Sequence, residues 1–232
     1  MMNHQIKASL MSNEQTITPE RQYSSKTIYI EGLELAGKST TCRMLRARLD
    51  AEYRHCAFLP GNPIYDCASA LHVAGKVRGE TLGGLFLGSV MRDLERYTPP
   101  DHFVVQDSTS VLRSIAYHSV VGDPGLAEAF RGLLPRCPRF GASFVLWSSN
   151  EVRLRRLEGR ISRRHDLPKD FLVRDEPDKF ARMQDIMIET AKEYFDAEIV
   201  DTSNMEQEGE KERLVEYLAS KLLRAARQTN AR

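Results

Sequence analysis

The sequence has few cysteines and no long apolar run, and these absences exclude several classes of protein. Its four cysteines, Cys42, Cys56, Cys67 and Cys137, form no CxxC pair and have no histidines at metal-ligand spacing. We therefore expect buried free thiols rather than disulfides or a metal site. No apolar run approaches the ~18–20 residues that span a bilayer, and residues 1–25 contain no apolar signal-peptide centre. These features predict a cytoplasmic protein without a membrane partner.

The charged residues are nearly balanced, so charge gives no reason to expect nucleic acid as a partner. The chain of 232 residues has 33 lysines and arginines, 32 aspartates and glutamates, and a formal net charge of +1. With 41% hydrophobic residues, a chain of this length can bury one substantial core. No internal repeat or long linker divides it. We therefore expect a single domain over residues 26–232, preceded by a disordered extension at residues 1–25.

Short β-rich runs alternate with longer helical patterns. The apolar runs that predict buried strands lie at residues 27–30, 55–58, 103–105, 143–147 and 198–200. The helical patterns lie at residues 38–52, 64–97 with a break around 79–84, 111–134, 150–162, 177–195 and 208–227. This alternation predicts an α/β domain with a parallel sheet of about five strands flanked by helices. In such sheets, ligands bind beyond the carboxyl ends of the strands.

Residues 32–39 fit the phosphate-binding pattern GxxxxGK[ST] without a mismatch. The pattern follows a predicted strand and opens a predicted helix, so glycine amides and a helix N-terminus can surround phosphate oxygens. Lys38 would reach the β- and γ-phosphates of ATP, and the Ser39 hydroxyl would bind Mg²⁺. The alternative is a glycine-rich turn with a chance lysine. The residues expected at ATP are Gly32, Leu33, Glu34, Leu35, Ala36, Gly37, Lys38, Ser39 and Thr40.

Two further features favour a small kinase over other P-loop proteins. The chain has no NKxD run for guanine and no signature of transporter ATPases. Residues 103–107 form an apolar run that ends in Asp107, a carboxylate suited to magnesium or to the attacking oxygen, or else to capping the next helix. Arginines crowd residues 153–164 before a polar segment, 162–170, that resembles a short lid. They would stabilise the moving phosphoryl charge, or simply form a solvated helix face.

Several segments, in order, resemble the thymidylate kinase family. Residues 28–40 are similar to its opening strand and P-loop, EG-[LI]-[DE]-x-AGK-[ST]-T. Residues 85–92 resemble a helix ending in an arginine, and residues 104–107 with 114–118 resemble the DR[YH] and AYQ segments. Glu151, Leu154, Arg156 and Arg160 match E-x-x-L-x-R-x-x-x-R, and residues 199–203 resemble the last strand and its exit loop. The resemblance spans about residues 26–225.

This resemblance implies a P-loop NTPase fold with a short lid, and γ-phosphoryl transfer from ATP to a nucleoside 5′-monophosphate such as dTMP. Asp107 would join Ser39 in organising Mg²⁺, and Arg156, Thr202 and Ser203 would border the adenine. Because position 35 is leucine and the lid is arginine-rich, the transition-state charge would come from Arg160, Arg163 or Arg164. The family forms homodimers, which makes a dimer an expectation here. The expected acceptor-binding residues are Glu34, Arg92, Arg113, Ser114, Tyr117 and His118.

The departures from the family pattern all fall in the acceptor half. Ser108 stands where the family has a phosphate-binding arginine, and His118 replaces a glutamine. The turn at residues 59–63 lacks the family's glutamate, and the gap from Arg92 to Asp107 is short. Arg113, one turn into the next helix, could replace the missing arginine. Two alternatives remain: a kinase for another small acceptor (a nucleoside, a modified nucleotide or a specialised metabolite), or an ATP-binding protein without transfer activity.

Overall fold

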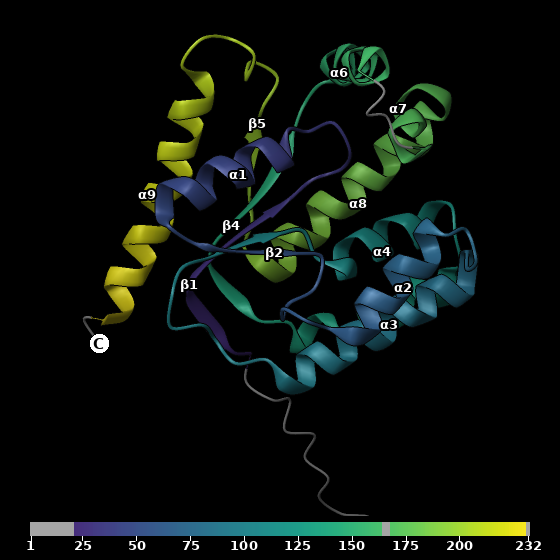
Figure 1. The fold of residues 1–232 in the computed structure, drawn as a ribbon, viewed down its shortest axis with the longest axis horizontal. Helices are drawn as coiled ribbons and strands as arrows, with labels where there is room; N and C mark the ends of the chain where they lie inside the picture. Colours follow the sequence, from purple (N-terminus) through teal and green to yellow (C-terminus); the bar gives the residue numbers. More distant parts are fainter. Residues whose placement is uncertain (1–20, 164–167, 231–232) are drawn as a thin grey trace, which may run out of the picture.

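The computed structural model describes residues 21–163 and 168–230, and these form a parallel five-stranded sheet with helices on both faces (Figure 1). The strand order is β2-β3-β1-β4-β5, and every neighbouring pair is parallel. This confirms the α/β fold and the parallel sheet expected from the sequence. The strands are β1 (Tyr23–Glu31), β2 (Glu52–His55), β3 (Val104–Asp107), β4 (Arg139–Trp147) and β5 (Glu198–Asp201).

The helices cover the two faces of the sheet in separate groups (Figure 1). Helices α1 and α9 pack on one face, and α4 and α8 pack on the other, with α3 beside α4. The helical segments are α1 (Lys38–Leu49), α2 (Pro63–Val73), α3 (Gly79–Arg96), α4 (Ser110–Val120), α5 (Pro124–Arg131), α6 (Asn150–Ser162), α7 (Leu172–Asp175), α8 (Pro177–Phe195), α9 (Glu210–Asn230), and the 3₁₀ turns η1 (Leu134–Arg136) and η2 (Pro168–Phe171).

The central strand β1 explains this two-sided core. Ile28 and Ile30 are fully buried and pack with Leu45 of α1 on one face. Tyr29 points to the other face, where its ring lies 5.2 Å from that of Phe195 in α8. Successive side chains of a strand alternate between faces, so a strand covered by helices on both sides is apolar throughout. The P-loop begins where this rigid strand ends.

Some element boundaries differ from the sequence predictions. The second strand was expected at 55–58, but β2 ends at His55, because it is the edge strand and alternates exposed polar residues with half-buried ones. The helical pattern 111–134 was expected to be continuous, but it divides into α4 and α5. Pro124 opens α5, and the Asp123 side chain caps it by accepting from the Leu126 N–H.

The predicted break in the 64–97 pattern is confirmed, although it lies between Val73 and Gly79 rather than at 79–84. Strand β1 begins at Tyr23, inside the segment 1–25 that was expected to be an extension. The rest of that segment, up to residue 20, lies outside the described residues. Within the described ranges, no helix combines the length and the apolar character needed to cross a membrane.

Candidate active site

The loop between β1 and α1 contains two glycines whose backbone conformation or surroundings disfavour a side chain. Gly32 has φ of 144°, and a Cβ at this position would lie 2.5 Å from the carbonyl oxygen of Leu146 in β4. Gly37 has φ of 89° and begins α1 without a capping side chain. Both positions therefore favour glycine. The uncapped amides at the start of α1 remain open to an anion.

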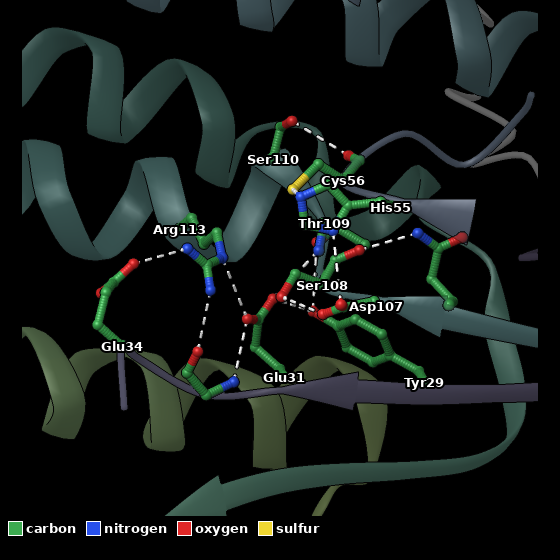
Figure 2. A network of polar contacts seen from close by, with 12 residues as sticks. Tyr29, Glu31, Glu34, His55, Cys56, Asp107, Ser108, Thr109, Ser110 and Arg113 are labelled. Atoms are coloured by element: carbon green, nitrogen blue, oxygen red, sulfur yellow. Dashed lines mark hydrogen bonds and ion pairs between the residues drawn. The ribbon is translucent and has the colours of Figure 1, made fainter. Parts of the chain in front are cut away.

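A buried carboxylate joins this loop to the end of β3 (Figure 2). Glu31 is fully buried, and its Oε1 accepts a hydrogen bond from the Gly32 N–H at 3.0 Å. Its Oε2 accepts from the Thr109 N–H at 3.1 Å and from the Tyr29 hydroxyl at 2.8 Å. Glu31 therefore fixes the first turn of the P-loop against the strand that carries Asp107.

Two arginines of α6 hold the P-loop from the opposite side. Arg153 is fully buried, and it donates to the carbonyl oxygen of Glu34. Burial lowers its pKa to about 10. Arg156 donates to the carbonyl oxygens of Leu35 and Thr202, at 2.8 and 2.7 Å. Part of the arginine-rich segment therefore has a structural role. Neither interpretation made from the sequence, a solvated helix face or a cluster that stabilises phosphoryl charge, included this role.

The loop after β5 also contacts the P-loop. Thr202 is fully buried, and its hydroxyl lies 2.8 Å from the carbonyl oxygen of Ala36. Ser203 accepts a hydrogen bond from the backbone N–H of the residue that caps α6. These two residues were expected to border adenine. The structure engages both in backbone contacts, and Met205 and Glu206, slightly further along the chain, line the neighbouring cavity instead.

A cavity of about 460 Å³ lies between the P-loop, α6 and the start of α9; we call it the α6 cavity. Arg156, which was expected near the adenine, lines it together with Arg160 and Arg163, which were expected to supply transition-state charge. The side chain of Arg163 donates back to the carbonyl of Gly159 in its own helix. Arg164, also expected in the site, lies outside the described residues.

A second cavity of about 290 Å³ lies over the P-loop itself; we call it the P-loop cavity. Lys38, Ser39, Asp107 and Arg160 line it, so the structure brings together the residues predicted for phosphate, magnesium and transition-state charge. Burial, together with the positive charge of Arg113, lowers the pKa of Lys38. A buried ammonium of this kind is stabilised by an anion in the same cavity.

Asp107 is buried and held by side chains of β2 and of the turn that follows β3 (Figure 2). Its Oδ2 accepts from the Tyr53 hydroxyl at 2.6 Å and lies 3.5 Å from Nδ1 of His55, while its Oδ1 accepts from Ser108 at 3.3 Å. Burial raises the pKa of Asp107, but the bonds from His55 and Tyr53 and the nearby P-loop lysine lower it to about 2. An ionised carboxylate and the Ser39 hydroxyl, both lining one cavity, are oxygen donors that suit Mg²⁺.

Cys56 lies beside this group and was not expected there. Its Sγ is 3.4 Å from Nε2 of His55, and its backbone has φ of 59°. Burial raises the pKa of its thiol, yet His55 and Arg113 outweigh burial, so the pKa lies below its usual value. The four cysteines are free, as predicted, but Cys56 is only half-buried and Cys67 is exposed. The expectation that all four thiols are buried was wrong.

Arg113 of α4 joins the P-loop to the acceptor side (Figure 2). Its Nη1 donates to Glu34 Oε1 at 3.0 Å, its Nη2 donates to the Gly32 carbonyl at 3.1 Å, and its Nε lies 3.5 Å from Glu31 Oε1. Lys169 of η2 contacts the same Glu34 oxygen at 3.3 Å. Burial raises the pKa of Glu34, but these cations, together with the P-loop lysine, lower it to about 2.

A third cavity of about 400 Å³ lies between α3 and α4, and we call it the α3–α4 cavity. Arg113, Ser114 and Tyr117, three of the residues expected to bind the acceptor, line it. His118 also lines it but is only 5% exposed, and its Nδ1 accepts from the Asp123 N–H at 3.2 Å. Burial lowers the pKa of His118, which therefore acts mainly as a packed, neutral side chain.

Arg92 does not reach these cavities. Its Nη1 pairs with Oδ1 of its neighbour Asp93 at 3.1 Å, and it lines none of the three cavities described above. Asp93 is buried and accepts from the backbone N–H groups of Phe58 and Leu59. The expected helix around Arg92 is present as α3, but the Asp93 carboxylate holds the Arg92 side chain away from the predicted acceptor site.

A fourth cavity, of about 540 Å³, lies elsewhere. Arg21, Tyr23 and Arg139 line it at the amino ends of β1 and β4, together with residues near the end of α9. Parallel sheets bind their ligands at the carboxyl ends of the strands. The phosphate motif also lies at that opposite end, so we place the chemistry in the three smaller cavities.

Comparison with known proteins shows similarity in fold to solved structures, at low sequence identity. No protein-family model and no curated protein matches the sequence. The thymidylate kinase of Candida albicans is 16% identical, with a TM-score of 0.57 over 84% of this chain and 91% of its own. The thymidylate kinase of Ehrlichia chaffeensis is 11% identical, with a TM-score of 0.51 over 88% and 98%.

A deoxyadenosine kinase from M. mycoides, solved with bound dCTP, is 17% identical, with a TM-score of 0.52 over 84% of this chain and 98% of its own. At these identities, the likeness shows a common fold. The chain therefore has the P-loop kinase fold found in thymidylate kinases, as the motif resemblance implied.

Proposed function

We propose that the protein is an ATP-dependent phosphotransferase that moves the γ-phosphoryl group of ATP onto a small acceptor. One observation carries this proposal: the P-loop cavity adjoins both of the other cavities through shared lining residues. The P-loop cavity shares Arg160 with the α6 cavity, and it shares Arg113 and Lys169 with the α3–α4 cavity. A nucleotide in the first two cavities and an acceptor in the third would bracket the phosphoryl group, as in-line transfer requires.

The residues of the P-loop cavity support binding of ATP with magnesium. The loop amides would hold the β-phosphate, and Lys38 would contact the transferring group. Ser39 and Asp107 would hold Mg²⁺, and this ion neutralises phosphate charge when bound. Arg160 would add charge from the α6 side, where Asp170 orients its Nη1 at 2.7 Å. Adenine would lie in the α6 cavity beside Arg156 and Met205.

For the acceptor, we propose a nucleoside monophosphate of dTMP type as the first candidate. The α3–α4 cavity offers cations at its inner end, Arg113 and Lys169, and aromatic walls at Phe86 and Tyr117. A phosphate near the cations and a base against the rings would match this distribution. The structurally similar thymidylate kinases support the same acceptor class.

A second candidate is an acceptor that offers a hydroxyl group instead of a phosphate. The observation in its favour is that Arg113 is already paired with Glu34 and Glu31, so this guanidinium offers little net positive charge to an acceptor phosphate. The missing family arginine at Ser108 points the same way. The similar deoxyadenosine kinase is named for a nucleoside acceptor.

The test is ADP release from ATP–magnesium across dTMP, dUMP, dCMP, dGMP, dAMP, UMP, CMP, the parent nucleosides and a blank without acceptor. Strong stimulation by dTMP supports the first candidate, and stimulation by nucleosides alone supports the second. Slow ADP release that no acceptor stimulates, with ATP still bound, contradicts transfer to this class of acceptor. That outcome would favour an ATP-binding protein or a more specialised substrate.

A further inference from the structure

Lys169 is a cation of the active site that sequence reasoning did not identify. It lies in η2 (Pro168–Phe171), and its Nζ is 3.3 Å from Oε1 of the P-loop residue Glu34. The same side chain lines both the P-loop cavity and the α3–α4 cavity. Its position is therefore at the boundary that a phosphoryl group would cross between donor and acceptor.

Arg113 also lines both cavities, but the two cations are held very differently. The guanidinium of Arg113 contacts Glu34, Glu31 and the carbonyl of Gly32 at once. The Lys169 side chain is 52% exposed, and its ammonium pairs only with Glu34 among the described residues. A half-exposed ion pair of this kind is weak and exchanges readily. Arg113 is thus a fixed cation and Lys169 a movable one.

The environment of Glu34 keeps the free-energy cost of releasing Lys169 low. The Glu34 side chain is only 10% exposed, so leaving its carboxylate without a partner would be costly. If Lys169 leaves, Arg113 still neutralises Glu34 at 3.0 Å. If Arg113 left instead, the buried carboxylate of Glu31 would also lose a cation. Lys169 is therefore the cation that can turn toward an incoming phosphoryl group without exposing a buried charge.

Its neighbour in sequence has a complementary position. Asp170 is fully buried and contacts Arg160 at 2.7 Å, and Arg160 lines the P-loop cavity and the α6 cavity. The turn η2 thus holds one cation, Arg160, which lines the P-loop and α6 cavities, and carries a second, Lys169, which lines the P-loop and α3–α4 cavities. The P-loop cavity is the one that both cations line.

We propose that Lys169 is a catalytic residue, whose ammonium leaves Glu34 and binds the γ-phosphoryl oxygens of ATP during transfer. This inference rests on the proposed phosphotransferase function. With a monophosphate acceptor, an ionised acceptor oxygen forms a bond to the γ-phosphorus as the bond to the bridging oxygen breaks. ADP keeps the electron pair of the broken bond. No proton moves, and Lys169 remains protonated and stabilises the charge on the moving group.

Binding of two nucleotides tests the contact without any acceptor. We would measure the dissociation constants of a non-hydrolysable ATP analogue and of ADP, each with magnesium, by calorimetry. Lys169→Ala should weaken the analogue about five- to tenfold and ADP less than about twofold, because only the analogue carries a γ-phosphoryl group. Lys169→Arg should restore most of the loss. The matched control is Lys221→Ala, which removes an exposed ion pair with Glu198 far from the P-loop and should change neither value.

A second variant makes the exchange itself measurable. Glu34→Gln removes the competing anion, so it should tighten analogue binding when Lys169 is present and have a smaller effect in the Lys169→Ala background. Equal loss of ADP and analogue in Lys169→Ala would mean that Lys169 only supports the P-loop, and no loss would mean that it makes no contact; either result overturns the proposal.

Turnover distinguishes this inference from the proposed function. If an acceptor is found, Lys169→Ala should lower kcat on the order of 100-fold, while the KM for ATP rises no more than the five- to tenfold expected for analogue binding. A γ-specific binding loss without any acceptor-dependent turnover would support the Lys169 contact while contradicting the proposed function. A wild-type chain that binds neither nucleotide would refute both.

Discussion

The proposed ATP side and the proposed acceptor side of the site are built in different ways. On the ATP side, buried side chains from three separate elements bind the P-loop backbone: Glu31 at an N–H group, and Arg153, Arg156 and Thr202 at carbonyl oxygens. On the acceptor side, charged side chains pair mainly with one another, as Arg113 does with Glu34. The first arrangement fixes a backbone cradle before any ligand arrives. The second leaves specificity to a few side chains, which can change without disturbing the fold.

The largest effect should come from the ATP side. Lys38→Ala removes the P-loop ammonium, so we expect acceptor-dependent ADP release to fall on the order of 10³-fold or more. The fold should persist, because the loop is held by other residues. A steady-state assay combined with a thermal unfolding curve checks both points. Lys192→Ala, an exposed lysine of α8, is the control, and retained turnover in Lys38→Ala would contradict the P-loop assignment.

Arg113→Met should mainly affect stability. It leaves the carboxylates of Glu31 and Glu34 without their shared guanidinium, and we expect a loss of about 3–5 kcal/mol in the free energy of unfolding. Chemical denaturation measures this loss. Arg131→Met, which removes an exposed pair with Glu128, is the matched control and should cost less than about 1 kcal/mol. Similar losses in the two variants would show that the ion pairs of Arg113 with Glu31 and Glu34 do not stabilise the fold more than an exposed pair does.

Glu34 should make stability depend on acid pH. Its pKa is lowered from 4.5 to about 2 in the folded protein, so it stabilises the fold above pH 4.5 and loses this contribution as the pH falls through 2. The wild type should exceed Glu34→Gln by about 3 kcal/mol in free energy of unfolding near pH 6. This difference should shrink between pH 4.5 and 2. A constant difference across that range would mean that the charge of Glu34 is not what stabilises the fold.

Arg92→Ala should have the smallest effect, although sequence resemblance placed Arg92 at the acceptor. Its side chain is directed to Asp93 and away from the cavities. We therefore expect the KM for the acceptor to change less than about twofold. Stability should fall by about 1–2 kcal/mol, less than in Arg113→Met, because the buried Asp93 carboxylate keeps hydrogen bonds from two backbone N–H groups and from Asn62. Steady-state kinetics with the best acceptor of the panel provide the measurement. A tenfold rise in KM would mean that Arg92 leaves Asp93 on substrate binding and would extend the acceptor site to α3.

Local patterns predicted the P-loop and its flanking strand and helix well. The motif at residues 32–39, the strand before it and the helix after it are neighbours in sequence, so the P-loop could be identified from spacing alone. Asp107 could also be placed, because it ends an apolar strand at the carboxyl edge of the sheet. Edge strand β2 was misplaced because its alternating polar residues lack the apolar run of a central strand.

Contacts between distant segments could not be predicted in this way. The approach of Lys169 to Glu34 joins residues 135 positions apart, and nothing local distinguishes Lys169 from other exposed lysines. Burial of Arg153 depends on the packing of α6 against the P-loop and α8. The position of Arg92 depends on its neighbour Asp93, which also accepts hydrogen bonds from the backbone N–H groups of Phe58 and Leu59. In each case, tertiary packing decided which of several polar partners a long side chain would choose.

Two residues with left-handed backbones, Cys56 and Ser108, lie at the carboxyl ends of adjacent strands, with φ of 59° and 62°. Each costs about 1–2 kcal/mol for a residue other than glycine. Ser108 follows Asp107 in the sequence, and the Cys56 N–H donates to the carbonyl oxygen of Asp107 at 3.0 Å. In a saturation library selected for folding, these two positions should accept glycine, asparagine and aspartate and reject valine and isoleucine, whereas the exposed Tyr117 should vary freely. Substitutions that change acceptor specificity should therefore be tolerated more often in α4 than in the turn that positions Asp107.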